Sequence, residues 1–514
     1  MHRCLKVAEI LFLIFERLYD QPATLGALAE TCTGFSETAL NLLWRALSSL
    51  VPLIKVMPED LWAVEPETSP RCMGLKVLIF TRQLEERDWE RFRFYAGRIH
   101  RFGYYRPGIP FENGIHIHEN VLTALTSYTP VCSLLPNLRA LQAVLEGPHI
   151  LKSPSFFPAI LCPRLTEIKI RAMSLSKEMY TFLSSVACLC PNLRSLDIHT
   201  SEEDIVTSEF ISAMEHLVCS LPDIRRLSVE FPEEALCTTS AMIDHLGSLP
   251  NLSICFISQV PPDKTMSELQ SLFTTEGGRF PALSKFAYTA PTLALARAVI
   301  ESLQCPLQQL AVDISASEEP IPALASFTSS FRYHRCSSSL TSFCLTGYSE
   351  LDSVDSASMC AAFSSLFSLR ALEHIYIGFF WVSHLDDTWY ANAATAWPHL
   401  RALDFSYNDP PKVTLSGLIP LIRNCRRLDT LTLSIVAKPF DPEILQVGDR
   451  NLAITHLSLQ DSEIESPVDV YRCLLQLASS LGLACELSSF VARRDYTSLY
   501  HLLCKLSHLS VTPL

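Results

Sequence analysis

The chain lacks the sequence features that identify most membrane, secreted and nucleic-acid-binding proteins. It contains no uninterrupted apolar run of about eighteen residues, which argues against a membrane-spanning helix. The apolar stretch from Ile10 to Phe15 lies between Glu9 and Glu16, and such acidic flanks are unlike those of a secretory signal. A formal net charge of −13 over 514 residues argues against a nucleic-acid-binding surface. We therefore expect a cytoplasmic or nuclear protein.

Motifs for catalysis and metal binding are missing as well. The sequence has no phosphate-binding loop, no His-Glu-x-x-His and no Gly-x-Ser-x-Gly. Its 18 cysteines include no Cys-x-x-Cys pair, so a structural zinc site is not expected. Buried free thiols are normal in a reducing compartment. The expectation is a protein that is not an enzyme and holds no cofactor or metal.

A repeated pattern is present instead, Pro-x-Leu-x-x-Leu-x-Leu, in which other apolar residues can replace the leucines. It is clearest at Pro191-Asn192-Leu193-Arg194-Ser195-Leu196-Asp197-Ile198. We call the first leucine of each copy its anchor, and successive anchors are 24 to 33 residues apart. This spacing is typical of long leucine-rich repeats. The twelve anchors are Leu138, Leu165, Leu193, Ile224, Leu252, Leu283, Leu307, Leu340, Leu372, Leu400, Leu428 and Ile454.

Each repeat combines the periods of a helix and of a strand. The end of the pattern alternates apolar and variable residues, as a strand with one buried face does. Between the patterns, apolar residues recur three and four apart, for example Phe210, Met214 and Leu217. The predicted fold is α/β: a leucine-rich-repeat solenoid with a curved parallel sheet inside and helices outside. The alternative, a doubly wound α/β domain, requires no constant sequence at each strand.

Residues 1–48 follow a different pattern. Three short helical segments are separated by Pro22 and Ser36, and together they cannot bury all their apolar residues. We predict a small three-helix module at 1–48 and a connecting helical segment at 49–130. The solenoid of about twelve repeats should occupy 131–465, and a C-terminal helical cap 466–514.

The N-terminal module resembles a known family. The run Val7-Ala8-Glu9-Ile10-Leu11-x-x-Ile14-Phe15-x-x-Leu18 resembles the opening of an F-box, in which the position of Ala8 is usually proline. Leu28-Ala29-x-Thr31-Cys32-x-x-Phe35, followed by Leu43-Trp44, is similar to its second half, and Asp88-Trp89-Glu90-Arg91-Phe92 resembles the helix that joins the two parts. The whole chain resembles fungal F-box proteins with degenerate leucine-rich repeats.

This resemblance implies a function and a set of contacts. F-box modules dock onto the Skp adaptor of a cullin-type (SCF) ubiquitin ligase, while the repeats recruit a protein substrate for degradation. The expected partners are therefore a Skp-type adaptor, through it a cullin scaffold, and an unidentified protein substrate. The residues expected to contact the adaptor are Leu5, Val7, Glu9, Ile10, Leu11, Ile14, Phe15 and Leu18.

The substrate is expected on the concave face of the sheet. In each strand, the residue between the last two apolar positions points away from the helices, and so does the residue after them. The resulting surface is mixed and mostly polar, with two aromatic residues. The candidates for substrate binding are Lys169, Arg171, Asp197, His199, Glu230, Phe256, Tyr376 and Asp404.

An alternative function remains open at this point. A free-standing repeat protein could act as an interaction scaffold or regulator without any role in ubiquitin transfer. Its N-terminal helices would then only cap the array. Binding to a Skp-type adaptor separates the two hypotheses.

Overall fold

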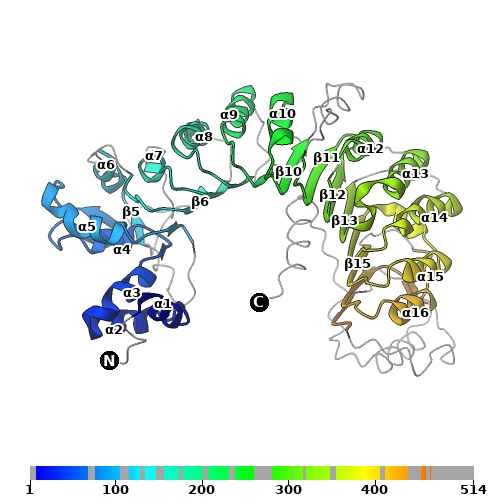
Figure 1. The fold of residues 1–514 in the computed structure, drawn as a ribbon, viewed down its shortest axis with the longest axis horizontal. Coiled ribbons are helices and arrows are strands. Elements are labelled where there is room, and N and C mark those ends of the chain that lie inside the picture. The colour runs from blue at the N-terminus through cyan, green and yellow to red at the C-terminus, as the bar shows by residue number, and fades with distance from the viewer. Residues whose placement is uncertain are drawn as a thin grey trace. The chain divides into compact units, whose positions relative to one another are not determined.

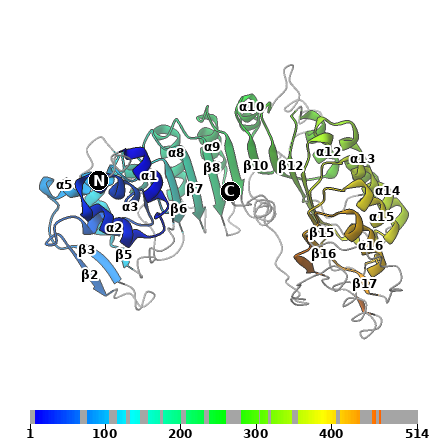
Figure 2. The same cartoon turned by 60° about the horizontal axis from the view of Figure 1, so that its bottom comes forward.

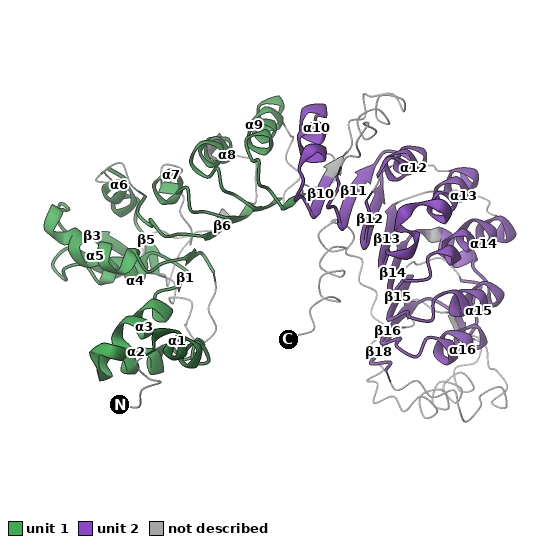
Figure 3. Ribbon diagram, viewed as in Figure 1, with its two compact units in different colours: residues 1–235 green, residues 236–514 purple. Residues whose placement is uncertain are grey.

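The fold is described from a computed structural model that consists of two compact units, residues 1–235 and residues 236–514 (Figure 3). Each unit is described by itself. The structure describes residues 7–66, 76–104, 115–127, 133–145, 156–172, 177–200, 207–230, 238–259, 280–303, 305–315, 320–347, 355–405, 411–437, 453–458 and 463–464.

Unit 1 begins with three helices and continues into a short mixed segment (Figure 1). The helices are α1 (Ala8–Glu16), α2 (Pro22–Thr31) and α3 (Thr33–Leu43). The following elements are β1 (Ala46–Leu47), α4 (Val51–Lys55), β2 (Trp62–Pro66), β3 (Lys76–Phe80), the 3-10 turn η3 (Glu86–Asp88), α5 (Trp89–Ala96), β4 (Arg101–Phe102), β5 (Ile115–Ile117) and α6 (Glu119–Ser127). Strands β2, β3 and β5 form a separate sheet of three strands.

The rest of unit 1 consists of repeats, each with one strand and one helix. In chain order they are β6 (Ala140–Leu145), α7 (Phe156–Ile160), β7 (Glu167–Ala172), α8 (Lys177–Leu189), β8 (Ser195–Thr200), α9 (Ser208–Cys219) and β9 (Arg226–Glu230). Strands β1, β4, β6, β7, β8 and β9 pair in this order, and every described pair is parallel. Figure 2 shows β6, β7 and β8 side by side, with α8 and α9 on one side of them.

Unit 2 continues the same alternation. Its helices are α10 (Ser240–Ser248), α12 (Leu293–Ser302), α13 (Ile321–Ser330), α14 (Ser356–Ser364), α15 (Asp387–Ala396) and α16 (Leu415–Asn424). Its strands are β10 (Ile254–Gln259), β11 (Lys285–Ala290), β12 (Gln309–Ile314), β13 (Ser342–Gly347), β14 (His374–Gly378), β15 (Ala402–Phe405), β16 (Thr430–Leu433) and β18 (His456–Ser458). These strands pair in parallel, with one shift of register between Ile257 and Gln259 on β10, and α12 to α16 lie along one face of them (Figure 1).

Short 3-10 turns and one small pair of strands complete the described part of unit 2. They are η4 (Phe331–Tyr333), η5 (Arg335–Ser338), η6 (Ser365–Ser368), η7 (Phe380–His384), β17 (Val436–Ala437) and β19 (Glu463–Ile464).

The residue directly before each parallel strand has the same backbone role in both units. We call these the lead residues. The carbonyl of Arg139 accepts hydrogen bonds from the N–H groups of Thr166 and Glu167, at 2.9 and 3.1 Å, and the carbonyl of Thr166 does the same for Arg194 and Ser195. Unit 2 repeats this arrangement: the carbonyl of Thr341, for example, accepts hydrogen bonds from the N–H groups of Glu373 and His374. A single bonding pattern therefore sets the register from repeat to repeat.

The predicted repeat pattern is confirmed at the level of the parallel sheet and its outer helices. All twelve predicted anchors are buried, and each directly precedes a lead residue. The next two apolar positions of the pattern, such as Phe343 and Leu345 in β13, are buried on the same side of the strand. The fourteen parallel strands, six in unit 1 and eight in unit 2, are consistent with the predicted solenoid.

Several helices of the repeats begin in the same way. Thr207, Thr239 and Thr292 precede α9, α10 and α12, and each accepts a hydrogen bond from a backbone N–H in the first turn. Asp355 and Asp386 do this for α14 and α15. Such caps satisfy N–H groups that have no partner within the helix, so the helix start is fixed by sequence.

The predicted boundaries need three corrections. The segment 49–130 was predicted as helical, but it contains the sheet β2–β3–β5 as well as β4. Because β1 and β4 already belong to the parallel sheet, the array begins at Ala46 rather than at residue 131. Helix α3 starts at Thr33, ahead of Ser36. The predicted cap at 466–514 lies outside the described residues.

Within the described part of the chain, none of the helices combines the length and apolar character that crossing a bilayer would need.

Candidate functional site

Helix α1 exposes apolar side chains on its outer face. Val7, Ile10, Leu13 and Ile14 keep 41%, 37%, 63% and 44% of their surface exposed, and we call them the α1 stripe. The helix is apolar around most of its circumference, whereas a surface helix normally presents a polar outer face. Clustered exposed apolar residues are typical of a surface that binds another molecule.

The inner face of α1 forms the core of the three helices. Leu11 and Phe15 are buried and pack with Leu25, Ala39 and Leu42. The ring of Phe15 meets Phe35 edge to face, with centroids 5.3 Å apart. Leu11 and Phe15, predicted as adaptor contacts, therefore belong to the core, because a side chain enclosed by its own module offers no surface to a partner.

The other predicted contacts are placed as follows. Glu9 is exposed and Leu18 is half-buried against the core. Leu5 lies outside the described residues. Leu13, the most exposed residue of the stripe, was missed because it falls outside the family pattern. Contact with an adaptor stays a prediction for Val7, Glu9, Ile10, Ile14 and Leu18.

The three helices are fixed to the repeats by a buried arginine. Arg98, which follows α5, donates hydrogen bonds at 2.8 and 2.9 Å to the two carboxylate oxygens of Glu37 on α3, and it also bonds Asn41. These bonds hold the pKa of Glu37 below its ordinary value. The rings of Trp44 and Tyr95 pack at 4.3 Å between centroids. The α1 stripe is thus held in a defined position within unit 1.

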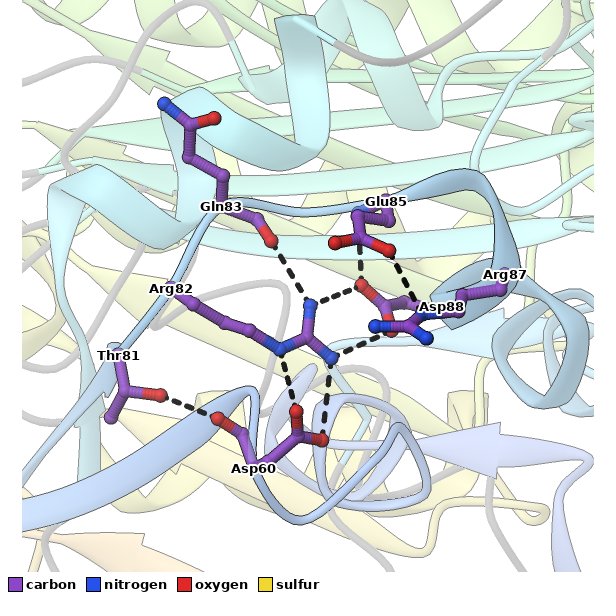
Figure 4. Close-up of polar contacts among 7 residues, drawn as sticks. All are labelled: Asp60, Thr81, Arg82, Gln83, Glu85, Arg87 and Asp88. Atoms are coloured by element: carbon purple, nitrogen blue, oxygen red, sulfur yellow. Dashed lines mark hydrogen bonds and ion pairs between the residues drawn. The ribbon is translucent and has the colours of Figure 1, made fainter.

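A second ionic cluster organises the connecting segment (Figure 4). The Arg82 guanidinium donates to both carboxylate oxygens of Asp88 at 2.7 and 2.8 Å, and to Asp60 at 2.7 and 3.3 Å. Asp88 also accepts a bond from the Glu85 N–H at 2.9 Å, and its side chain is fully buried. The cluster joins three segments: the loop before β2, the end of β3 and the start of α5. We assign it a structural role.

The predicted substrate contacts of unit 1 lie on three adjacent strands. Lys169 on β7 pairs in register with Asp197 on β8, and Arg171 pairs with His199, which pairs with Glu230 on β9. Lys169 lies 3.5 Å from Glu167 on its own strand. The structure therefore brings these five positions together on the face opposite α8 and α9. Substrate binding there stays a prediction.

The predicted contacts of unit 2 lie in one row across its strands. Phe256 on β10 and Tyr376 on β14 have three residues between them, and Asp404 follows on β15. The three between are Ala287, Ala311 and Cys344, which are buried and form one cluster, and Phe256 and Tyr376 pack against this cluster. The expectation of a mostly polar surface is therefore wrong for this row, which is apolar from β10 to β14.

No metal centre is evident in the part of the chain that the structure describes. Within it, no group of three or more histidine, cysteine, aspartate or glutamate side chains could hold a metal ion. Cys190 and Cys425, which occupy matching positions of two repeats, are buried, and burial raises the pKa of these two thiols to about 12. These thiols therefore stay protonated near neutral pH and behave as small apolar groups.

Comparisons with known proteins give likenesses among solved structures only. No family model matches the sequence, and no curated protein matches it. Among solved structures, the chain is similar to one described as the crystal structure of the Rad7 and Elc1 complex in yeast. The match has 14% sequence identity and a TM-score of 0.33, and it covers 80% of this chain and 90% of that chain.

Proposed function

We propose that the protein is a non-enzymatic adaptor that recruits a protein substrate to a cullin-type (SCF) ubiquitin ligase. In this proposal the α1 stripe docks onto a Skp-type adaptor, and the helix-free face of the repeats binds the substrate. The observation that carries the proposal is the α1 stripe, because a small module that already fills its core with Leu11 and Phe15 has no internal use for a second apolar face.

The attachment of the module to the repeats supports this proposal. An adaptor that presents a substrate to a separate enzyme needs a defined geometry between its two binding surfaces. The bonds from Arg98 to Glu37 and Asn41, together with the pairing of β1 with β4, supply such a geometry within unit 1.

The first test is binding to a purified Skp-type adaptor. We expect the wild type to bind at micromolar concentration or tighter, and the double variant I10D/I14D to bind roughly 100-fold more weakly. The loss follows because two carboxylates would be buried in an apolar interface without partners. Biolayer interferometry on the full chain measures both affinities.

The matched control carries the same change elsewhere. L189D/Y333D also replaces two exposed apolar residues by aspartate, and neither residue lies on α1. Its affinity should stay within about twofold of the wild type. Failure of the wild type to bind at micromolar concentration, or equal losses in both double variants, would contradict the proposal.

A free-standing scaffold whose helices cap the repeats is the second candidate, and the burial of Arg98 against α3 favours it. Deleting residues 1–43 separates the two, because this variant keeps Trp44, Arg45 and β1. If the helices dock an adaptor, a saturating Skp-type adaptor should raise the melting temperature of the full chain, since a ligand of the folded state stabilises it. The adaptor should leave the melting temperature of the deletion variant unchanged. If the helices only cap the array, the adaptor changes neither.

A further inference from the structure

The lead residues differ in charge between the two units although their backbone role is the same. Those of unit 1 include four arginines and no acidic residue: Arg45, His100, Arg139, Thr166, Arg194 and Arg225. Those of unit 2 are mostly uncharged: Ser253, Ser284, Gln308, Thr341, Glu373, Arg401, Asp429 and Thr455. Because serine, threonine and glutamine suffice at this position in unit 2, the backbone pattern does not require arginine.

Two of these arginines, Arg194 and Arg225, precede adjacent strands. Neighbouring parallel strands lie about 4.8 Å apart, and like charges on adjacent strands repel each other. Arg194 and Arg225 are direct neighbours, and Arg226 follows at once. Arg139 and Arg194 have exposed side chains, and neither is paired with a carboxylate in the described part of the chain. In unit 2, by contrast, Arg401 is paired with Glu373 at 3.2 Å.

The half-buried His100 indicates that positive charge accumulates here. Burial lowers the pKa of His100, and the charges of Arg139, Arg45 and Arg164 lower it further. His100 is therefore neutral near pH 7, and three guanidinium groups lie close enough to act on one imidazole.

The acidic side chains near the lead residues of unit 1 neutralise only part of the positive charge of the arginines. Glu16 contacts Arg45 at 3.3 Å, and Glu167 accepts a bond from the Tyr104 hydroxyl at 3.0 Å. Asp223 lies two residues before Arg225. The lead residues between His100 and Arg194 thus keep a net positive charge.

We propose that the lead arginines of unit 1 bind an extended acidic segment of another protein, whose carboxylate or phosphorylated side chains meet the guanidinium groups. Arginine suits both groups because its planar fork can donate two parallel hydrogen bonds. From Arg45 to Arg225 the lead residues span roughly 24 Å, the length of about seven residues of extended chain. A nucleic acid is disfavoured because the whole chain has a net charge of −13, which repels a long polyanion.

This inference extends the proposed function, because it names the chemistry of the recruited segment. The interpretation of that segment as a recruited substrate rests on the proposed function. Binding of an acidic peptide can nevertheless be measured without any Skp-type adaptor. A failed adaptor experiment and a failed peptide experiment are therefore distinguishable.

The test measures fluorescence anisotropy of labelled twelve-residue peptides with the full chain at about 50 and 200 mM salt. One peptide alternates glutamate and serine, the second carries phosphoserine in place of glutamate, and the third carries glutamine. The variants are R139Q/R194Q and the control R87Q/R93Q, which removes two exposed arginines from η3 and α5 and causes the same charge change. Circular dichroism verifies folding of each variant, and R139K/R194K provides a charge-conserving second variant.

We expect the glutamate or the phosphoserine peptide, or both, to bind the wild type, with weaker binding at the higher salt. R139Q/R194Q should bind about tenfold more weakly, while R87Q/R93Q should stay within about twofold and R139K/R194K should lie between. The two acidic peptides distinguish a carboxylate from a phosphate ligand, and either result supports the proposal. Equal binding of the glutamine peptide, equal affinity of R139Q/R194Q and wild type, or tighter binding of a single-stranded oligonucleotide of the same length would overturn it.

Discussion

Replacing Phe343 by alanine is expected to lower the free energy of unfolding of unit 2 by about 4 kcal/mol. Phe343 is fully buried on the helix side of β13, where its ring meets Phe331 edge to face at 5.6 Å. Its neighbours in register, Leu310 and Ile375, are buried as well. The truncation therefore leaves a cavity between three repeats. Because repeats are stabilised mainly by their neighbours, the loss should spread beyond β13.

Urea denaturation followed by circular dichroism measures this effect on the full chain. The control is Tyr333→Ala, which removes an aromatic ring from the same unit. Tyr333 is 88% exposed, and its ring contacts Arg332. This variant should cost less than about 1 kcal/mol. Similar losses in the two variants would show that β13 is not packed as described.

The repeats were predictable from sequence because their signal is local and periodic. Each anchor, such as Leu193 or Leu340, is buried whatever its neighbours are, since the alternation after it places the next apolar residues on the same face. Proline before the strand, as at Pro191, ends the helix by removing a donor. Twelve such copies identified the parallel sheet without any knowledge of contacts between repeats.

The sequence pattern does not reveal that the array of parallel strands begins at β1, and the reason is physical. Trp44 and Ile99 take the place of the anchor leucine before β1 and β4, and these strands contain only two residues each. Two residues are too few for an alternating pattern. Their pairing depends on backbone contacts across long stretches of sequence, such as the carbonyl of Arg45 accepting from the N–H of His100 at 2.9 Å. Periodicity in one segment does not encode contacts of this kind.

The candidate sites were predicted only in part, since burial depends on neighbouring elements. The F-box pattern covered both faces of α1 and therefore did not separate the exposed Ile10 and Ile14 from the buried Leu11 and Phe15. The lead arginines gave no signal until the backbone bonds placed residues far apart in sequence, such as Arg45 and Arg139, along one edge of the sheet.

Replacing Asp88 by asparagine should destabilise unit 1 by about 2 kcal/mol at pH 7, and this loss should shrink as the pH is lowered. The double bond from Arg82 to the buried carboxylate lowers the pKa of Asp88, and the Glu85 N–H lowers it as well. The folded state therefore holds a proton at Asp88 less readily than the unfolded state, whose pKa is about 3.9. The carboxylate contributes stability above that pH, and this contribution is lost as the pH falls through the pKa of the folded state.

Unfolding of wild type and D88N in urea at pH 7, 5 and 3 measures the difference directly. Arg82 keeps its hydrogen bonds to Asp60 in D88N, so wild type and D88N share these contacts of the cluster. The control is Glu90→Gln on α5, which changes the same kind of charge on an exposed side chain and should alter the free energy of unfolding by less than about 0.5 kcal/mol. A difference between wild type and D88N that stays constant from pH 7 to pH 3 would mean that the charge of Asp88 contributes nothing. The cluster would then stabilise unit 1 by packing alone.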